Sequence, residues 1–259
     1  MTTATVDLSW RNWAGNQTSV AAAVARPTSV AEVAEIVRTA RASGGTVKPV
    51  GSGHSFTATA ATTGTRLDLF ALTGIVDADP ESKLVRVRAG TPLHVLNTEL
   101  ARRGLAMPNL GDIAVQTISG ALATGTHGTG RAYGCLSTFV AELEVVTGTG
   151  EVVRCSPTVE PDLFAAAQVG VGAVGVVTEV TLRTTDAFVL HADERTAALG
   201  DVLASVDERV ATNDHFEFYW FPYTERVLTK TNNRVGVDDR PRSRLSAWFN
   251  EDLMENTAL

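Results

Sequence analysis

The sequence is poor in the residues that mark disulfide-rich, zinc-binding and nucleic-acid-binding proteins. Its 259 residues include only two cysteines, Cys135 and Cys155, and no CxxC spacing, which argues against a disulfide framework and favours reduced thiols. Positive charge is scarce too, because 22 Lys and Arg stand against 29 Asp and Glu and no basic cluster is present. We therefore expect no nucleic-acid partner and no metal site.

Long apolar runs are also missing. The longest, VGVGAVGVV at residues 169–177, falls far short of the roughly 18 residues that a membrane-spanning helix needs. The first residues show no basic flank followed by an apolar core, so we expect a cytoplasmic protein without a transmembrane segment. Apolar residues still make up 44% of the chain, enough for the core of one large domain or of one and a half ordinary ones.

Several common catalytic and nucleotide-binding motifs are absent. GSGHS at residues 51–55 lacks the third glycine of the dinucleotide fingerprint, and GTHGTG at residues 125–130 lacks the lysine of a P-loop. No HExxH or GxSxG motif occurs either. These absences argue against a Rossmann fold, a P-loop fold, a zinc hydrolase and a serine hydrolase.

The residues that are present predict a mixed α+β fold. Apolar periodicity and turn residues predict helices over 26–45, 91–104, 160–170 and 196–213, and strands or hairpins over 46–50, 66–70, 75–90, 142–156, 175–184 and 215–232. Ser29 and Glu32 have the spacing of a capping box, with Gly44 as the helix stop, and Thr91 stands where the cap of the second helix is expected.

A change of composition near residue 186 predicts a domain boundary. Residues 1–185 form one predicted domain, and residues 186–259 begin a second that ends without an element to complete its sheet. The second part contains nine of the sixteen aromatic residues, five of them in the sequence HFEFYWF. Alternation places three of them on one face, where we expect core packing, and two residues on the other: Phe216, Phe218 and Trp220, against Glu217 and Tyr219.

Two segments rich in small residues are the candidate functional site. They are VGSGHSFTATA, residues 50–60, and LGDIAVQTISGALATGTHGTGRAYG, residues 110–134. Glycine-rich backbone lets several N–H groups converge on one anion, and His54 and His127 would then stand beside a bound anion or ring. The ordinary alternative for each histidine is a solvated side chain in a loop, and for each segment a simple turn.

With these segments assembled, the chain resembles the flavin-dependent sugar-lactone and alditol oxidoreductases of the vanillyl-alcohol oxidase superfamily, and most of all the gulono- and arabinono-1,4-lactone oxidase or dehydrogenase group. The resemblance lies in WRNWAGNQ, PVGSGHSFT, TISGALATGTHGTG, QVGVGAVGVVTEVTL and HFEFYWFPYTERVLTKTNN. It implies a PCMH-type FAD-binding domain of two α+β subdomains over residues 1–185, followed by an incomplete α+β substrate-binding domain.

The resemblance also implies roles for individual residues. His54 would carry FAD covalently through the 8α-methyl group of the isoalloxazine, Thr117 would lie near the flavin ring, and Gly111 would influence oxygen access. The implied FAD-binding residues are Val50, Gly51, Ser52, Gly53, His54, Ser55, Thr117, Ser119, Gly120, Thr124, His127, Gly128, Gly175 and Val176.

The implied reaction is hydride transfer from a carbinol of a sugar 1,4-lactone or alditol to flavin N5, with reoxidation by oxygen or another acceptor. The family continues well beyond residue 259, and its C-terminal His-Trp-Gly-Lys motif has no match in this sequence. One alternative is therefore a non-catalytic FAD-binding half that needs a second chain. Another is a nucleotide-binding or hydrolytic α+β protein with unrelated loops.

Overall fold

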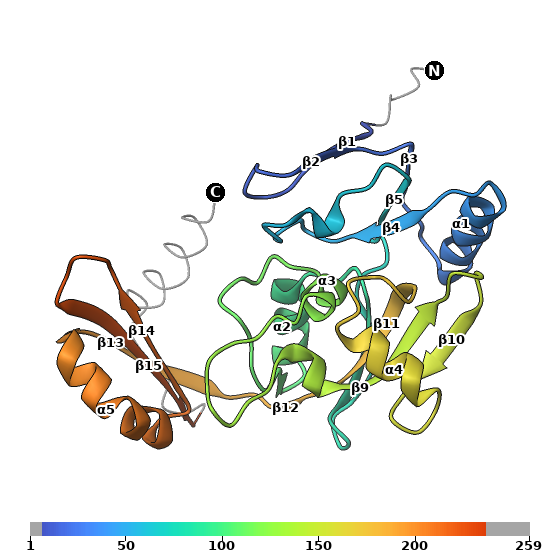
Figure 1. The fold of residues 1–259 in the computed structure, drawn as a ribbon. Helices are drawn as coiled ribbons and strands as arrows, with labels where there is room; N and C mark the ends of the chain where they lie inside the picture. Colours follow the sequence, from blue (N-terminus) through green and yellow to red (C-terminus); the bar gives the residue numbers. More distant parts are fainter. Residues whose placement is uncertain (1–6, 237–259) are drawn as a thin grey trace. The chain divides into compact units, whose positions relative to one another are not determined.

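The computed structural model describes residues 7–236, which form two compact units divided between Asp186 and Ala187 (Figure 1). Both units combine helices with sheets, as the periodicity predicts. Within the described residues, no helix combines the length and the apolar character needed to cross a membrane. The expectation that the second domain ends without a closing element concerns residues 237–259, which lie outside the described part.

The first unit begins with a small parallel sheet covered by one helix. Its strands lie in the order β3 (Ala23–Ala25), β5 (Thr65–Asp68) and β4 (Val47–Val50), and helix α1 (Val30–Ala42) connects β3 to β4. Parallel neighbours require such a crossover, because a tight turn cannot join them. The helix buries Val33 and Val37 against Leu67 of β5, and this packing fixes the end of β4, where the GSGHS sequence begins.

The caps of two helices show which local predictions hold. Ser29 caps α1, its hydroxyl accepting from the backbone N–H of Glu32 at 3.3 Å, while the Glu32 carboxylate accepts from the N–H of Thr28 at 2.7 Å. The predicted capping box thus forms only in part, because the Glu32 carboxylate bonds to the N–H of Thr28, one residue before the cap, and not to that of Ser29. The predicted Thr91 cap is wrong, because α2 (Leu93–Ala101) begins after Pro92 and the Thr91 hydroxyl donates to the carbonyl of Arg88 at 2.6 Å instead.

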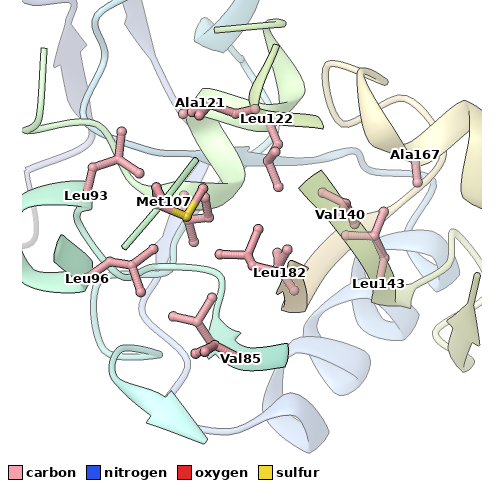
Figure 2. Packing of buried hydrophobic residues seen from close by; sticks show 14 of the residues in the cluster. Val85, Leu93, Leu96, Met107, Ala121, Leu122, Val140, Leu143, Ala167 and Leu182 are labelled. Atoms are coloured by element: carbon pink, nitrogen blue, oxygen red, sulfur yellow. The ribbon is translucent and has the colours of Figure 1, made fainter. Parts of the chain in front are cut away.

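A five-stranded antiparallel sheet forms the second part of this unit. Its strands lie in the order β10 (Val152–Cys155), β9 (Val140–Val146), β11 (Val176–Arg183), β7 (Leu84–Arg88) and β6 (Ile75–Asp79). Helices α2, α3 (Ile118–Ala123) and α4 (Pro161–Gln168) contribute to the core beside it. Figure 2 shows Val85, Leu96, Leu122 and Leu182 converging there, and each such side chain contributes about 1.5–3 kcal/mol by burial.

Short elements complete the first unit. They are the antiparallel pairs β1 (Ser9–Arg11) with β2 (Thr18–Val20) and β8 (Leu105–Ala106) with β12 (Thr185–Asp186), and the 3₁₀ turns η1 (Ala58–Ala60) and η2 (Leu136–Phe139). The sequence predicted none of these pairs, because two or three residues are too few to show a period.

The second unit is a three-stranded antiparallel sheet with one helix. Its strands lie in the order β13 (Val189–Ala198), β15 (Arg226–Val235) and β14 (His215–Trp220), and helix α5 (Leu199–Thr212) buries Val202 beside Phe216. Phe218 joins this core, as predicted, but the expected packing of Trp220 is wrong. Trp220 is the last residue of β14, is 50% exposed, and donates its indole N–H to the carbonyl of Thr224 at 2.9 Å.

Candidate functional site

The first unit contains a cleft whose empty volume is about 1050 Å³, its open mouth included. Most of its lining residues come from three segments that are far apart in the sequence: residues 48–55, in and after β4, residues 116–124, around α3, and residues 167–177, between α4 and β11 (Figure 1). Leu69, Leu122 and Leu143 give part of the wall an apolar character. A cleft that is apolar with a few polar groups is typical of a cofactor or ligand site.

The two small-residue loops lie against each other in this cleft. A Cβ on Gly51 would stand 2.5 Å from Oγ1 of Thr117 and 3.7 Å from Cα of Gly120. Ser52 strengthens the approach, since its hydroxyl donates to the carbonyl of Val115 at 2.5 Å. Only glycine allows this distance at residue 51, because any side chain would push Thr117 away. The loops therefore share one surface, although more than sixty residues separate them.

In the GSGHS loop, residues 51–55, the backbone carbonyls and the backbone N–H groups differ in their hydrogen bonding. Its carbonyls are held by the preceding hairpin, where Trp13 N–H donates to Gly53 at 2.9 Å and the Asn12 side-chain amide donates to Ser55 at 2.9 Å. The backbone N–H groups of residues 52–55 make no hydrogen bond to any other residue in the described part of the chain. These donors belong to residues that line the cleft, and backbone N–H groups without a protein partner are the chemistry that binds an anion such as a diphosphate.

His54 stands in the lining of the cleft with its ring partly covered. The indole of Trp13 stacks on the imidazole, with the ring centroids 5.2 Å apart and the planes 20° from parallel. Burial lowers the pKa of His54 below its ordinary value, because it disfavours the charged form. Burial thus favours the neutral imidazole, which keeps a nitrogen lone pair.

Lys48 is a cleft residue that the sequence analysis missed. It lies on β4, and its ammonium donates to the carbonyl of Val171 at 2.8 Å, while burial lowers its pKa. Val171 has a φ of 45°, a left-handed conformation that is uncommon for a β-branched residue, and its N–H donates to the carbonyl of Ala123 at 3.2 Å. These two hydrogen bonds hold Val171, and with it the lining segment at residues 167–177, in place. Alternation along the strand could have identified Lys48 as a cleft residue, because it puts Lys48 on the same face as Val50.

Most of the residues singled out from the sequence line the cleft. They are Val50, Gly51, Ser52, Gly53, His54, Ser55, Thr117, Ser119, Gly120, Thr124 and Gly175. Thr117 is buried and caps α3, its hydroxyl accepting from the N–H of Gly120 at 3.3 Å. In the described part of the chain, no three His, Cys, Asp or Glu side chains are grouped as a metal would require.

Four expected residues lie outside this lining: Gly111, His127, Gly128 and Val176. Gly111 and His127 lie together, since a Cβ on Gly111 would stand 3.0 Å from the His127 carbonyl oxygen. The His127 ring contacts the carbonyl of Gly128, with Nδ1 3.0 Å from the oxygen. Val176 pairs with Val146 in the central sheet and is buried in the core.

The fold places the chain in a known structural class. It matches a mutant of cholesterol oxidase from Brevibacterium sterolicum with a TM-score of 0.79, at 21% identity, over 92% of this chain and 49% of that one. A solvent-stable cholesterol oxidase matches with the same TM-score, at 22% identity, over 88% of this chain and 48% of that one. The fold is therefore the PCMH-type FAD-binding fold that the resemblance implied.

Sequence comparison gives the family. Residues 21–156 match the FAD binding domain family, and the chain belongs to it. Residues 180–259 match the family described as D-arabinono-1,4-lactone oxidase, which confirms the predicted resemblance.

Individual relatives are named as oxidases or dehydrogenases of sugar lactones. L-gulono-1,4-lactone dehydrogenase of Mycobacterium tuberculosis is 43% identical over 90% of this chain and 54% of its own length. L-gulonolactone oxidase of Bos taurus is 34% identical over 93% and 54%, and D-arabinono-1,4-lactone oxidase of Yarrowia lipolytica is 34% identical over 85% and 43%. The chain thus spans about half the length of the curated relatives it matches.

The residues of the cleft fit FAD, the cofactor of the family. The N–H groups of residues 52–55 suit its diphosphate, and the apolar wall around Leu122 and Leu143 suits a ring system. Gly51 and Gly120 keep the meeting point of the loops free of side chains. The neutral imidazole of His54 adds a nucleophilic nitrogen at the edge of the same space.

Proposed function

We propose that this chain is the FAD-binding part of an oxidoreductase that oxidises a carbinol of a sugar 1,4-lactone or an alditol. The names of the relatives and the match of residues 180–259 support the substrate class. The observation that carries the proposal is the shared cleft, in which the GSGHS loop and the loop around Thr117 come together with the N–H donors of residues 52–55 available.

The residues of the cleft have separate roles in this proposal. The N–H groups of the first loop hold the diphosphate, and His54 forms a covalent bond to the 8α-carbon of the flavin. Thr117 lies beside the flavin ring, with Ser119, Gly120 and Thr124 toward the ribityl chain. His127 and Gly128 belong to the phosphate side, and the backbone of Gly175 and Val176 to the adenine. Bound FAD supplies the acceptor for the substrate's hydride.

The cleft itself supplies few proton acceptors. Lys48 and His54 are the ionisable side chains among the described residues that line it, and Lys48 is already bonded to the carbonyl of Val171. Oxidation of a carbinol also requires a base for the hydroxyl proton. We therefore assign the base, and most of the substrate contacts, to residues that do not line this cleft or to a second chain.

Two finer points belong to the same proposal. Oxygen or another acceptor reoxidises the flavin, and Gly111 influences oxygen access, lying so close to His127 that a Cβ there would stand 3.0 Å from the His127 carbonyl oxygen. The protein is cytoplasmic, in keeping with two cysteines that are both free thiols.

Reconstitution with FAD tests the proposal. The purified chain is expected to retain flavin through gel filtration and, with the rest of the substrate domain supplied, to lose the visible flavin absorbance when L-gulono-1,4-lactone, D-arabinono-1,4-lactone or an alditol is added without oxygen. Flavin that binds but is bleached by none of these compounds would support a non-catalytic FAD-binding half instead. A folded chain that binds no flavin would contradict the proposal altogether.

A further inference from the structure

The hairpin that precedes the first helix reaches the GSGHS loop and places an aromatic ring on His54. The Trp13 indole stacks on the imidazole at a centroid distance of 5.2 Å, and the Phe56 ring lies 6.0 Å from the Trp13 ring in a T-shaped arrangement, with the planes at 86°. Trp13 is 59% exposed, so the ring contributes little to the hydrophobic core. An exposed tryptophan in this place needs another explanation than packing.

The backbone holds this ring in place. Trp13 N–H donates to the carbonyl of Gly53, the residue directly before His54, and the neighbouring Asn12 is buried and bonded to the carbonyl of Ser55, the residue directly after it. Gly53 has a φ of 72°, and a Cβ there would stand 3.4 Å from the ring of Trp10. The hairpin thus forms hydrogen bonds to the loop on both sides of His54. The indole covers one face of the imidazole, and His54 also lines the cleft.

The side chain of a histidine in a loop can adopt several rotamers. Three staggered wells for χ1 and two broad orientations for χ2 give about six arrangements of a free ring, of which about one directs a given nitrogen at a fixed target. A stacked indole removes the arrangements that break the contact. Orientation of a reacting group in advance raises the rate of its reaction.

We propose that Trp13 is a positioning residue for flavin attachment, holding the His54 imidazole so that a ring nitrogen meets the 8α-methyl group of bound FAD. This inference rests on the proposed function, because it requires FAD in the cleft and a covalent bond at His54. In the attachment one imidazole N–H bond and one methyl C–H bond break and a C–N bond forms. Two electrons and two protons pass to the flavin ring, from which dioxygen removes them as hydrogen peroxide.

The test measures the rate of attachment in the chain incubated with FAD and air. Protein samples are denatured at intervals, and covalent flavin is counted by intact mass and by in-gel fluorescence. We expect Trp13→Ala to attach flavin about sixfold more slowly than the parent chain, and Trp13→Phe, which keeps a flat ring, to stay within about twofold. Phe70→Ala removes an exposed aromatic ring of the same unit away from the cleft lining and is expected to attach at the parent rate.

A second readout does not depend on attachment. In the FAD-free protein, the ring-proton resonances of His54, assigned by comparison with His54→Gln, are expected to shift in Trp13→Ala, because they lose the ring current of the indole. Attachment by Trp13→Ala at the parent rate, or unchanged His54 resonances, would overturn the positioning role while leaving the proposed function intact. FAD that binds all chains but attaches to none would instead contradict the covalent bond itself, and the positioning role with it.

Discussion

A side chain at residue 51 tests whether the two loops meet. An alanine Cβ at Gly51 would stand 2.5 Å from Oγ1 of Thr117, about 0.9 Å closer than ordinary van der Waals contact, so Thr117 must move or rotate. Either change disturbs the bond from the N–H of Gly120 that caps α3. Overpacking of this kind costs roughly 1–3 kcal/mol, and a lost cap costs about 1 kcal/mol.

The double variant makes the prediction specific. Thr117→Ala alone loses the cap, at about 1 kcal/mol, but it also removes the atom that the new Cβ would strike. The next atom of residue 117, its own Cβ, is 3.7 Å away, an ordinary contact. Gly51→Ala combined with Thr117→Ala is therefore expected to be no less stable than Thr117→Ala alone, so the coupling equals the whole cost of Gly51→Ala, about 2–4 kcal/mol.

Urea denaturation of the FAD-free parent, the two single variants and the double variant measures this coupling. Alanine at Gly148 is the matched control, because that glycine has open space around its Cβ position and lies outside the cleft lining, so its effect is expected to be small and to add to that of Thr117→Ala. Additivity within about 0.5 kcal/mol for Gly51 and Thr117 would refute the contact between the loops.

Three further predictions concern single side chains. Lys48→Met removes the donor to the Val171 carbonyl, and we expect roughly tenfold weaker FAD binding, measured by fluorescence titration. An unchanged affinity would show that the hydrogen bond from Lys48 to Val171 does not shape the cleft. Since the pKa of His54 is lowered by burial, the neutral form is favoured on folding, and its contribution is complete above about pH 6.5 and is lost as the pH falls below it. The urea midpoint of the parent should therefore fall relative to that of His54→Gln between pH 7 and 5, and a constant difference would contradict this. Arg154→Met leaves three carboxylates of the central sheet without their shared cation and is expected to lower stability by about 1–3 kcal/mol at pH 7 and less at pH 3, measured by thermal unfolding; an equal cost at both values would contradict the charge argument.

Elements whose deciding contacts join residues close together in the sequence were predictable. The hairpin of β6 and β7 follows from alternation around Asp79 and Pro80, and the start of α1 follows from Ser29, because the atoms that decide these features lie within a few residues of each other. The strand β13 was missed because most of its residues are polar or exposed, so no alternating apolar pattern marks it. The error at Thr91 has a tertiary cause, since its hydroxyl also accepts from the N–H of Gly74, which a local reading cannot foresee.

The candidate site was predictable only in part. Glycine and histidine content pointed to the loops around His54 and Thr117, but their meeting in one cleft came from the family resemblance, because periodicity carries no information about distant contacts. Lys48 was missed for the same reason, as its partner Val171 is 123 residues away. His127 lies outside the cleft lining, with its ring against the carbonyl of Gly128, so its place beside the bound cofactor stays a prediction.

Peptide mapping of the FAD-loaded chain tests the central claim most directly. After incubation with FAD, denaturation and proteolysis, the account predicts that the peptide containing His54 carries the added mass of FAD and that the peptide containing His127 does not. Flavin attached at any other residue, or a chain that retains FAD in the folded state but releases all of it on denaturation, would contradict the placement of His54 at the flavin.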